Sequence, residues 1–138
     1  MPKGNALEFG PKSAAWLAVS KADVDARGPA SWWCASKEAQ PGDVLILYQC
    51  RRGLARVERL TGPAPTMEPR CADVGLRTVL TEFVFRIKVP VTLQELKEHP
   101  DLREMSAVRR SFQGTFFPVA PASWRVLRKL LESRATRD

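Results

Sequence analysis

The sequence predicts an α+β fold, in which a curled, barrel-like β-sheet of about five to six strands has short helices around it. The clearest strand covers residues 78–89, TVLTEFVFRIKV, where apolar and polar side chains alternate. The clearest helix covers residues 123–135, where apolar side chains recur at helical spacing behind Ser123, the expected N-cap. Glycine and proline divide the remaining apolar runs into short segments, which is typical of a sheet decorated by helices at one rim.

Further strands are indicated by local signals. Residues 13–20 form a short apolar run, and residues 44–49 follow a Pro-Gly-Asp turn with the β-branched and aromatic residues that strands prefer. Residues 54–60 and 114–119 are predicted as two more strands. Residues 61–76 are rich in proline and glycine and predict a long irregular connection, a kind of segment that is often functional.

The region after the long strand predicts short helices. Pro90 is expected to end that strand, and Thr92 then caps a helix with Glu95 in a T-x-x-E capping box. A second helical turn is expected at residues 101–105. Residues 32–39 fit neither a helical nor a strand period.

The chain has 138 residues, the length of one domain. We interpret residues 1–12 as a flexible N-terminal arm, residues 13–133 as the domain and residues 134–138 as a C-terminal tail. No stretch approaches the ~20 apolar residues that span a bilayer, so no membrane partner is predicted. The first residues also lack the apolar region of a signal peptide.

Charge and cysteine content narrow the partners and the compartment. The net charge of +7 permits an anionic partner, of which nucleic acid is the common one. The three cysteines are odd in number and form no C-x-x-C pair, which favours reduced thiols and a cytoplasmic protein. The one histidine, His99, is far from any close cysteine pair, so neither a metal nor a cofactor is expected.

Catalysis has little support in the sequence. A nucleophilic triad or dyad would have to use His99, which lies in the polar turn KEHPDL. No glycine-rich phosphate loop is present, and the carboxylates are scattered. An enzyme is therefore the weaker class, and no catalytic residue is predicted.

The segment SWWCASKEAQPGDVLILYQ, residues 31–49, carries the most informative residues. Trp32 and Trp33 stand outside any clear apolar period, so they either pack in the core or line a cavity. A flat indole stacks on a nucleobase with roughly 1–3 kcal/mol per base. The small neighbours Cys34 and Ser36 leave room beside the ring and can donate to a base edge.

Basic and amide side chains lie near the other turns. Arg109 and Arg110 precede SFQG, and arginines at strand ends can hold phosphate groups. Taken singly, each arginine is better explained as a solvated loop charge, and together with an exposed aromatic ring the arginines favour an anionic polymer as partner. Gln113 offers both donors and an acceptor, or else caps a turn, and Gly114 allows close backbone approach.

Five segments together resemble the EVE domain of the PUA-like superfamily, which also contains the YTH and ASCH domains. They are AAWLAVS, SWWCASKEAQPGDVLILYQ, GLARVERL, FVFRIKVPVTLQELKEHPDLREM and RRSFQGTFFPVAPASWRVLRKLL, within about residues 13–132. The resemblance implies a curled PUA-like β-barrel with a pocket for a flipped-out modified base. YTH relatives enclose a methylated adenine, and modified cytosines in DNA are among the ligands proposed for EVE relatives.

The resemblance also implies site residues. The base-stacking tryptophan falls on Trp33, or on Trp32 if the register differs by one residue. The polar base contacts at the first-strand exit fall on Ser20 and Lys21, and the phosphate contacts fall on Arg109 and Arg110. Cys34, Ser36 and Gln113, which are chosen for their side-chain chemistry, complete the predicted set. The predicted base-binding residues are therefore Trp33, Trp32, Cys34, Ser36, Ser20, Lys21 and Gln113.

One departure from the family pattern changes the expected pocket. YTH domains carry a second cage tryptophan after the long strand, whereas residues 86–91, RIKVPV, contain no aromatic residue. We therefore expect a two-sided slot, with Val89 or Leu93 as an aliphatic second wall. The function predicted is binding of DNA or RNA that presents a modified base. The alternatives are a small ASCH-like ribonuclease using Lys21, Tyr48 and Arg110, or a protein-interaction module that uses an exposed tryptophan patch.

Overall fold

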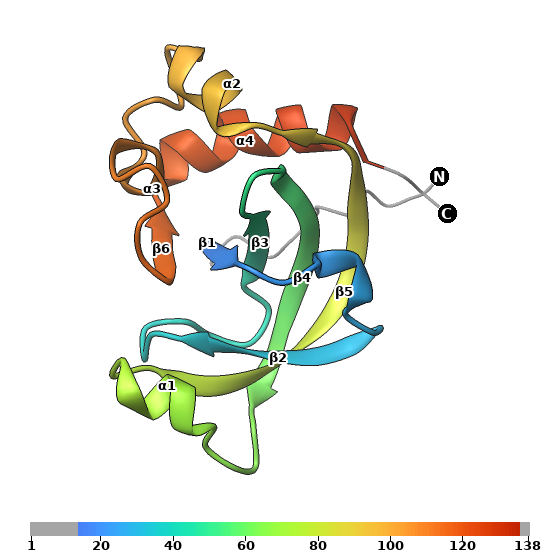
Figure 1. The fold of residues 1–138 in the computed structure, drawn as a ribbon, viewed down its shortest axis with the longest axis vertical. Coiled ribbons are helices and arrows are strands. Elements are labelled where there is room, and N and C mark those ends of the chain that lie inside the picture. The colour runs from blue at the N-terminus through green and yellow to red at the C-terminus, as the bar shows by residue number, and fades with distance from the viewer. Residues whose placement is uncertain (1–13, 136–138) are drawn as a thin grey trace.

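A computed structural model describes residues 14–135 as one mixed β-sheet that curls into a half-barrel, with helices around it (Figure 1). The six strands lie in the order β2-β5-β4-β3-β1-β6. Strands β1 and β3 pair in parallel, and the other neighbours are antiparallel. The α+β class and the curled, barrel-like sheet of about five to six strands predicted from the sequence are thus confirmed. The predicted arm at residues 1–12 lies outside the described residues.

The bounds of the elements follow the chain. The strands are β1 (Ala15–Ser20), β2 (Ala30–Ala35), β3 (Val44–Gln49), β4 (Gly53–Pro63), β5 (Arg77–Val91) and β6 (Phe116–Val119). The helices are the short 3-10 turn η1 (Val24–Ala26), α1 (Pro69–Asp73), α2 (Leu93–Glu98), α3 (Ser106–Arg109) and α4 (Pro121–Ser133). No helix of the described part of the chain is long and apolar enough to cross a membrane.

Alternation of side chains along the strands separates two apolar clusters. Leu17 and Ile46 point to the face on which α4 packs with Leu127 and Leu131. Trp16, Leu45 and Leu47 belong to the second cluster on the opposite face, against which the half-buried rings of Trp33 and Phe116 pack. The Trp33 ring therefore packs on the second apolar cluster at the β2 end of the sheet.

The Pro-Gly-Asp turn is held by a buried carboxylate. Asp43 accepts a hydrogen bond of 2.9 Å from Trp16 Nε1, and it also accepts from the backbone N–H groups of Ala14 and Gln40. A buried carboxylate that accepts several hydrogen bonds is satisfied without a counter-ion beside it. The predicted turn before residues 44–49 is thus present, and Asp43 fixes the start of β3 against β1.

Proline and cap positions differ from the predictions in two places. Pro90 does not end the long strand, because the β4–β5 register shifts between Leu54 and Arg56 and residues 87–90 face this irregularity. Ser123 does not cap α4: Ala120 is the N-cap, and Pro121 occupies the first turn, where its missing N–H breaks no helical bond. The capping box of Thr92 and Glu95 on α2 is confirmed.

Two segments without a predicted element are ordered. Residues 30–35, with both tryptophans, form the edge strand β2 paired with β5, although they show no alternation. The stretch at 61–76, predicted to be irregular, contains the end of β4 and the helix α1. Helix α1 has only five residues, too few for a helical period to show.

The prediction of three reduced thiols is wrong. Cys34 on β2 and Cys71 on α1 form a disulfide across 37 positions of sequence, and Cys50 is the free cysteine. Sequence spacing could not show this pairing, because the fold alone brings α1 beside β2. The cytoplasmic localisation, which depended on reduced thiols, stays a prediction. Cys34 also has no S–H group with which to donate to a ligand.

Candidate functional site

A hollow of about 690 Å³ opens between the two edges of the curled sheet. Edge strand β2 contributes residues 32–34, and the opposite edge contributes residues 19–23 at the end of β1 and residues 114–115 before β6. Arg27 and the region of α1 complete the lining with Arg70, Asp73 and Val74. The volume falls in the range of about 300–1,000 Å³ that is typical of ligand sites. We call this hollow the edge pocket.

The paired tryptophans both border the edge pocket, but they play different structural parts. They are consecutive in a strand, so their side chains leave β2 on opposite faces. The half-buried ring of Trp33 packs against the second apolar cluster. The ring of Trp32 lies under the guanidinium of Arg70, 5.4 Å from Cζ to the ring centroid. Trp33 therefore contacts the apolar interior of the sheet, whereas Trp32 contacts α1.

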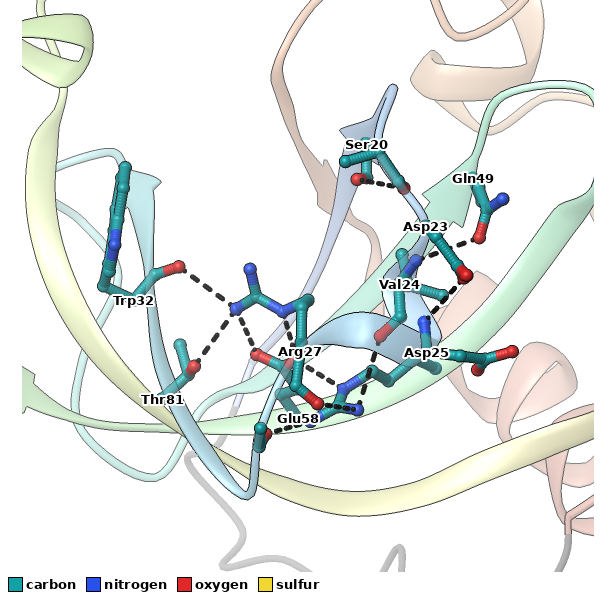
Figure 2. Close-up of polar contacts among 12 residues, drawn as sticks. Ser20, Asp23, Val24, Asp25, Arg27, Trp32, Gln49, Glu58 and Thr81 are labelled. Carbon is teal, nitrogen blue, oxygen red and sulfur yellow. Dashed lines mark hydrogen bonds and ion pairs between the residues drawn. The ribbon is translucent and has the colours of Figure 1, made fainter.

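A buried ionic network lies behind the pocket (Figure 2). Arg27 Nε and Nη2 each donate a 2.7 Å hydrogen bond to Glu58, and Nη2 also donates to the carbonyl oxygen of Trp32. The same guanidinium lies 5.1 Å from the centroid of the Trp33 ring. Arg27 thus contacts both tryptophans of the pocket wall: it bonds to the backbone of Trp32 and lies over the ring of Trp33.

Arg56 is the third member of this network. It donates to Glu58 at 2.6 Å and to the carbonyl oxygens of Arg27 and Gly28. Burial raises the pKa of Glu58, but hydrogen bonds from Arg27 and Thr81 and the two guanidinium charges outweigh it, so that pKa lies below its ordinary value. Glu58 is therefore a charged carboxylate with no exposed side-chain surface.

The loop between β1 and η1 forms the polar side of the pocket (Figure 2). Ser20 Oγ donates to the carbonyl oxygen of Ala22 at 2.9 Å. Gln49 Oε1 accepts from the backbone N–H of Val24, and Asp23 accepts from that of Asp25. These local bonds hold the loop, and the hydrogen of the Ser20 hydroxyl is already used within it.

Two buried polar atoms lack a partner within the described residues. They are Nε1 of Trp33 and Oγ of Ser36. An unpaired buried donor loses a hydrogen bond that water would supply, so it favours any acceptor that reaches it. Trp33 borders the pocket, but its Nε1 atom is itself buried, and Ser36 does not line the pocket.

Five predicted base-binding residues line the edge pocket: Trp33, Trp32, Cys34, Ser20 and Lys21. Gln113 is exposed beside the lining residue Gly114, and its backbone N–H bonds to Arg110. Gly114 itself has a φ of 141°, and a Cβ there would meet the Phe117 ring at 2.7 Å. Close approach of the chain thus requires this glycine, but the close neighbour is the protein's own ring.

Other predicted residues lie away from the pocket. Arg109 and Arg110 are exposed at the end of α3 and do not line it. The predicted aliphatic second wall is wrong: Val89 is exposed to solvent, Leu93 packs against the first apolar cluster, and neither lines the pocket. The side across from β2 is instead formed by the end of β1, while α1 lies beside β2.

The residues considered for a ribonuclease are not gathered together. Lys21 lines the pocket, Arg110 does not, and Tyr48 is buried with its ring stacked on Phe112 at 3.9 Å. Burial raises the pKa of the Tyr48 phenol. No group of three or more histidine, cysteine or acidic side chains within residues 14–135 could hold a metal ion.

Sequence reasoning missed several lining residues. Arg27, Asp23, Arg70 and Asp73 add two cations and two carboxylates to the pocket. No local pattern identifies them, because Arg27 and Asp23 stand in a loop, and Arg70 and Asp73 stand in the segment expected to be irregular.

The chain is thus a curled half-barrel domain with a pocket between its sheet edges that two tryptophans border. The family model for the EVE domain matches residues 14–130, so the chain belongs to the EVE domain family. No curated protein matches the chain.

Solved structures share this fold at low identity. A hypothetical protein from Leishmania major is 18% identical with a TM-score of 0.69, and the match covers 88% of this chain and 96% of that one. A Pseudomonas putida protein is 21% identical with a TM-score of 0.68, over 86% and 99%. The human THYN1 protein, crystallised with DNA containing 5-methylcytosine, is 16% identical with a TM-score of 0.65, over 87% and 98%.

Proposed function

We propose that this domain binds nucleic acid by accepting one flipped, modified base in the edge pocket. The observation that carries the proposal is the hollow of about 690 Å³ bordered by both indole rings of β2. The EVE family membership and the structural likeness to THYN1, which was crystallised with 5-methylcytosine DNA, support it. We propose no choice between DNA and RNA.

Stacking supplies the first part of the binding energy. Extruding a base from a duplex costs a few kcal/mol, and an aromatic stack returns roughly 1–3 kcal/mol per base. The Trp33 ring is held by the apolar cluster on one side and by Arg27, which Glu58 fixes, on another. A ring held in place in this way loses little conformational freedom when the base arrives.

Polar groups at the pocket supply the second part. The carboxylates of Asp23 and Asp73, which line the pocket, can accept from an exocyclic amino group of the base. Lys21 and Arg70 place cations at the pocket for the phosphates beside the extruded nucleotide. Cys34 takes no part as a donor, since its sulfur is in the disulfide.

The experiment compares affinities for one duplex in several forms. A fluorescein-labelled duplex carries 5-methylcytosine, N6-methyladenine or the unmodified base at one central position, as DNA and as RNA, and anisotropy gives each Kd. We expect one modified form to bind more tightly than its unmodified parent, and its titration to quench tryptophan fluorescence.

The variant Trp33→Leu keeps an apolar side chain against the cluster but removes the flat ring. We expect it to lose about ten-fold or more of the affinity for the preferred form, as loss of one base stack implies. Trp124→Leu is the matched control, because Trp124 is a half-buried ring on α4 outside the pocket lining. Equal losses in both variants, or no modified base preferred by the wild type, would refute the proposal.

A further inference from the structure

Helix α1 forms one wall of the edge pocket but has little packing of its own. It contributes Arg70 and Asp73 to the lining, followed directly by Val74. Cys71 is its one buried residue, and no side chain caps its N-terminus. A five-residue helix without a cap or an apolar face is not stable by itself, so tertiary attachments must hold it.

The attachments of α1 to the rest of the domain are few and of unequal strength. At its start the backbone N–H of Glu68 donates to Thr78 Oγ1 at 2.8 Å, which ties the segment to β5. On the side of β2, α1 is held by the Cys34–Cys71 disulfide and by the Arg70–Trp32 ring contact. A cation over a half-buried surface ring is a weak contact. The disulfide is therefore the main tie between α1 and the tryptophan strand.

We propose that the Cys34–Cys71 disulfide is a redox switch for the edge pocket. In the oxidised state the disulfide holds α1 against β2, so that Arg70 and Asp73 face the tryptophans. Reduction releases α1 from β2, opens that wall and weakens binding of the extruded base. The part that concerns the ligand rests on the function proposed above, whereas the release of α1 does not.

The geometry indicates how a dithiol reductant would act. Cys34 is half-buried and lines the pocket, whereas Cys71 is fully buried. One reductant thiolate therefore attacks the Cys34 sulfur, the disulfide bond breaks, and Cys71 leaves as a thiolate that takes up a proton. The second reductant thiolate then attacks the mixed disulfide, and Cys34 leaves and takes up a proton. The reductant is oxidised to its cyclic disulfide, and the protein ends with two thiols.

This route makes ligand binding and reduction mutually dependent. A base in the edge pocket covers the side from which Cys34 is reached, so an occupied pocket slows the attack. If the oxidised state binds the base more tightly, the bound base must in turn favour the oxidised state by the same factor.

The test uses Cys50→Ser as its background, because this removes the free thiol and leaves the disulfide as the only cysteine chemistry. Three samples are compared: Cys50→Ser oxidised, the same protein reduced with dithiothreitol, and a triple variant that also carries Cys34→Ser and Cys71→Ser. Hydrogen exchange reports residues 64–76, and anisotropy reports Kd for the duplexes with 5-methylcytosine and N6-methyladenine. The triple variant treated with dithiothreitol controls for effects of the reductant elsewhere.

We expect exchange in residues 64–76 to rise about ten-fold or more in the reduced and triple samples, with β3 and β4 unchanged. The Kd should rise about five-fold or more in the same two samples. Unchanged exchange would overturn the role of the disulfide in holding α1. Faster exchange with an unchanged Kd would overturn the switch while leaving base binding intact. An oxidised sample that binds no modified base would refute the proposed function, and the exchange data would still decide whether α1 is released.

Discussion

Arg27 and Glu58 form a two-bond ion pair: the guanidinium Nε donates to Oε2 and Nη2 donates to Oε1, both at 2.7 Å. The two residues are 31 positions apart in sequence. Arg27 belongs to the loop after η1 and Glu58 to β4, so the pair ties the pocket loop to the centre of the sheet. A planar, two-bond contact of this kind fixes orientation as well as distance.

The first prediction follows from this contact. Glu58→Gln removes the charge that Arg27 and Arg56 share and leaves two largely buried guanidinium groups without a carboxylate. Breaking a buried pair in this way destabilises a domain by about 3–5 kcal/mol. We expect a loss of this size in urea unfolding. We also expect weaker base binding at temperatures where the variant is folded, since Arg27 no longer holds the Trp33 ring.

Glu82→Gln is the matched control for that substitution. Glu82 lies on β5 and pairs with Arg59 at 3.3 Å in solvent. An exposed pair is worth about 0–1 kcal/mol, so this variant should unfold close to the wild type. If both variants lost the same stability, the buried network would not be the support that we infer.

The parts of the fold that sequence predicted are those with local causes. Strand β5 alternates its side chains, the Pro-Gly-Asp turn precedes β3, and the capping box of Thr92 and Glu95 starts α2. Each of these signals lies within a few residues, so pattern reasoning reaches it. The EVE resemblance added the pocket for an extruded base, which no local pattern contains.

The parts that sequence missed depend on contacts between distant segments. Strand β2 shows no alternation because both indoles are half-buried, one against the inner cluster and one beside α1. The Arg27–Glu58 pair and the Cys34–Cys71 disulfide each join elements that meet only in the folded sheet. The tryptophans were predicted to line the pocket from their position in the family pattern. The charged lining residues, such as Arg27 and Arg70, could not be predicted from any pattern.

The second prediction concerns acid stability. Glu95 on α2 accepts hydrogen bonds from Arg134 at 2.9 and 2.5 Å, and these lower the pKa of Glu95 from 4.5 to about 2. The unfolded chain then binds a proton more readily than the folded one. The contribution of Glu95 to stability is therefore complete above about pH 4.5 and is lost as the pH falls towards 2.

Glu95→Gln should flatten the fall of stability between these two pH values, measured by urea unfolding at successive pH. Glutamine can still serve in the capping box, so the change isolates the charge. The Glu95 side chain is 40% exposed, and we expect a loss of only about 1 kcal/mol or less at pH 7. Glu98→Gln, an exposed residue of the same helix, is the control and should leave the acid profile unchanged. An identical profile for both variants would contradict the pKa assignment.

The last prediction concerns the arginines at the end of α3. We propose that Arg109 and Arg110, which are exposed just before the turn that leads to Gly114, contact phosphate groups beside the extruded base. Phosphate contacts carry no base preference, so Arg109→Ala with Arg110→Ala should weaken modified and unmodified duplexes alike. The slope of log K against log salt should fall by about 1–2, close to one phosphate for each arginine.

A second double variant separates this contact from net charge. Arg125→Ala with Lys129→Ala removes two exposed charges from α4, where both side chains border a different hollow that also includes His99. Because that hollow shares no lining residue with the edge pocket, this variant should retain most of the salt slope. Equal slopes for the two double variants would mean that the domain responds to its overall charge, and the phosphate role of Arg109 and Arg110 would have to be abandoned.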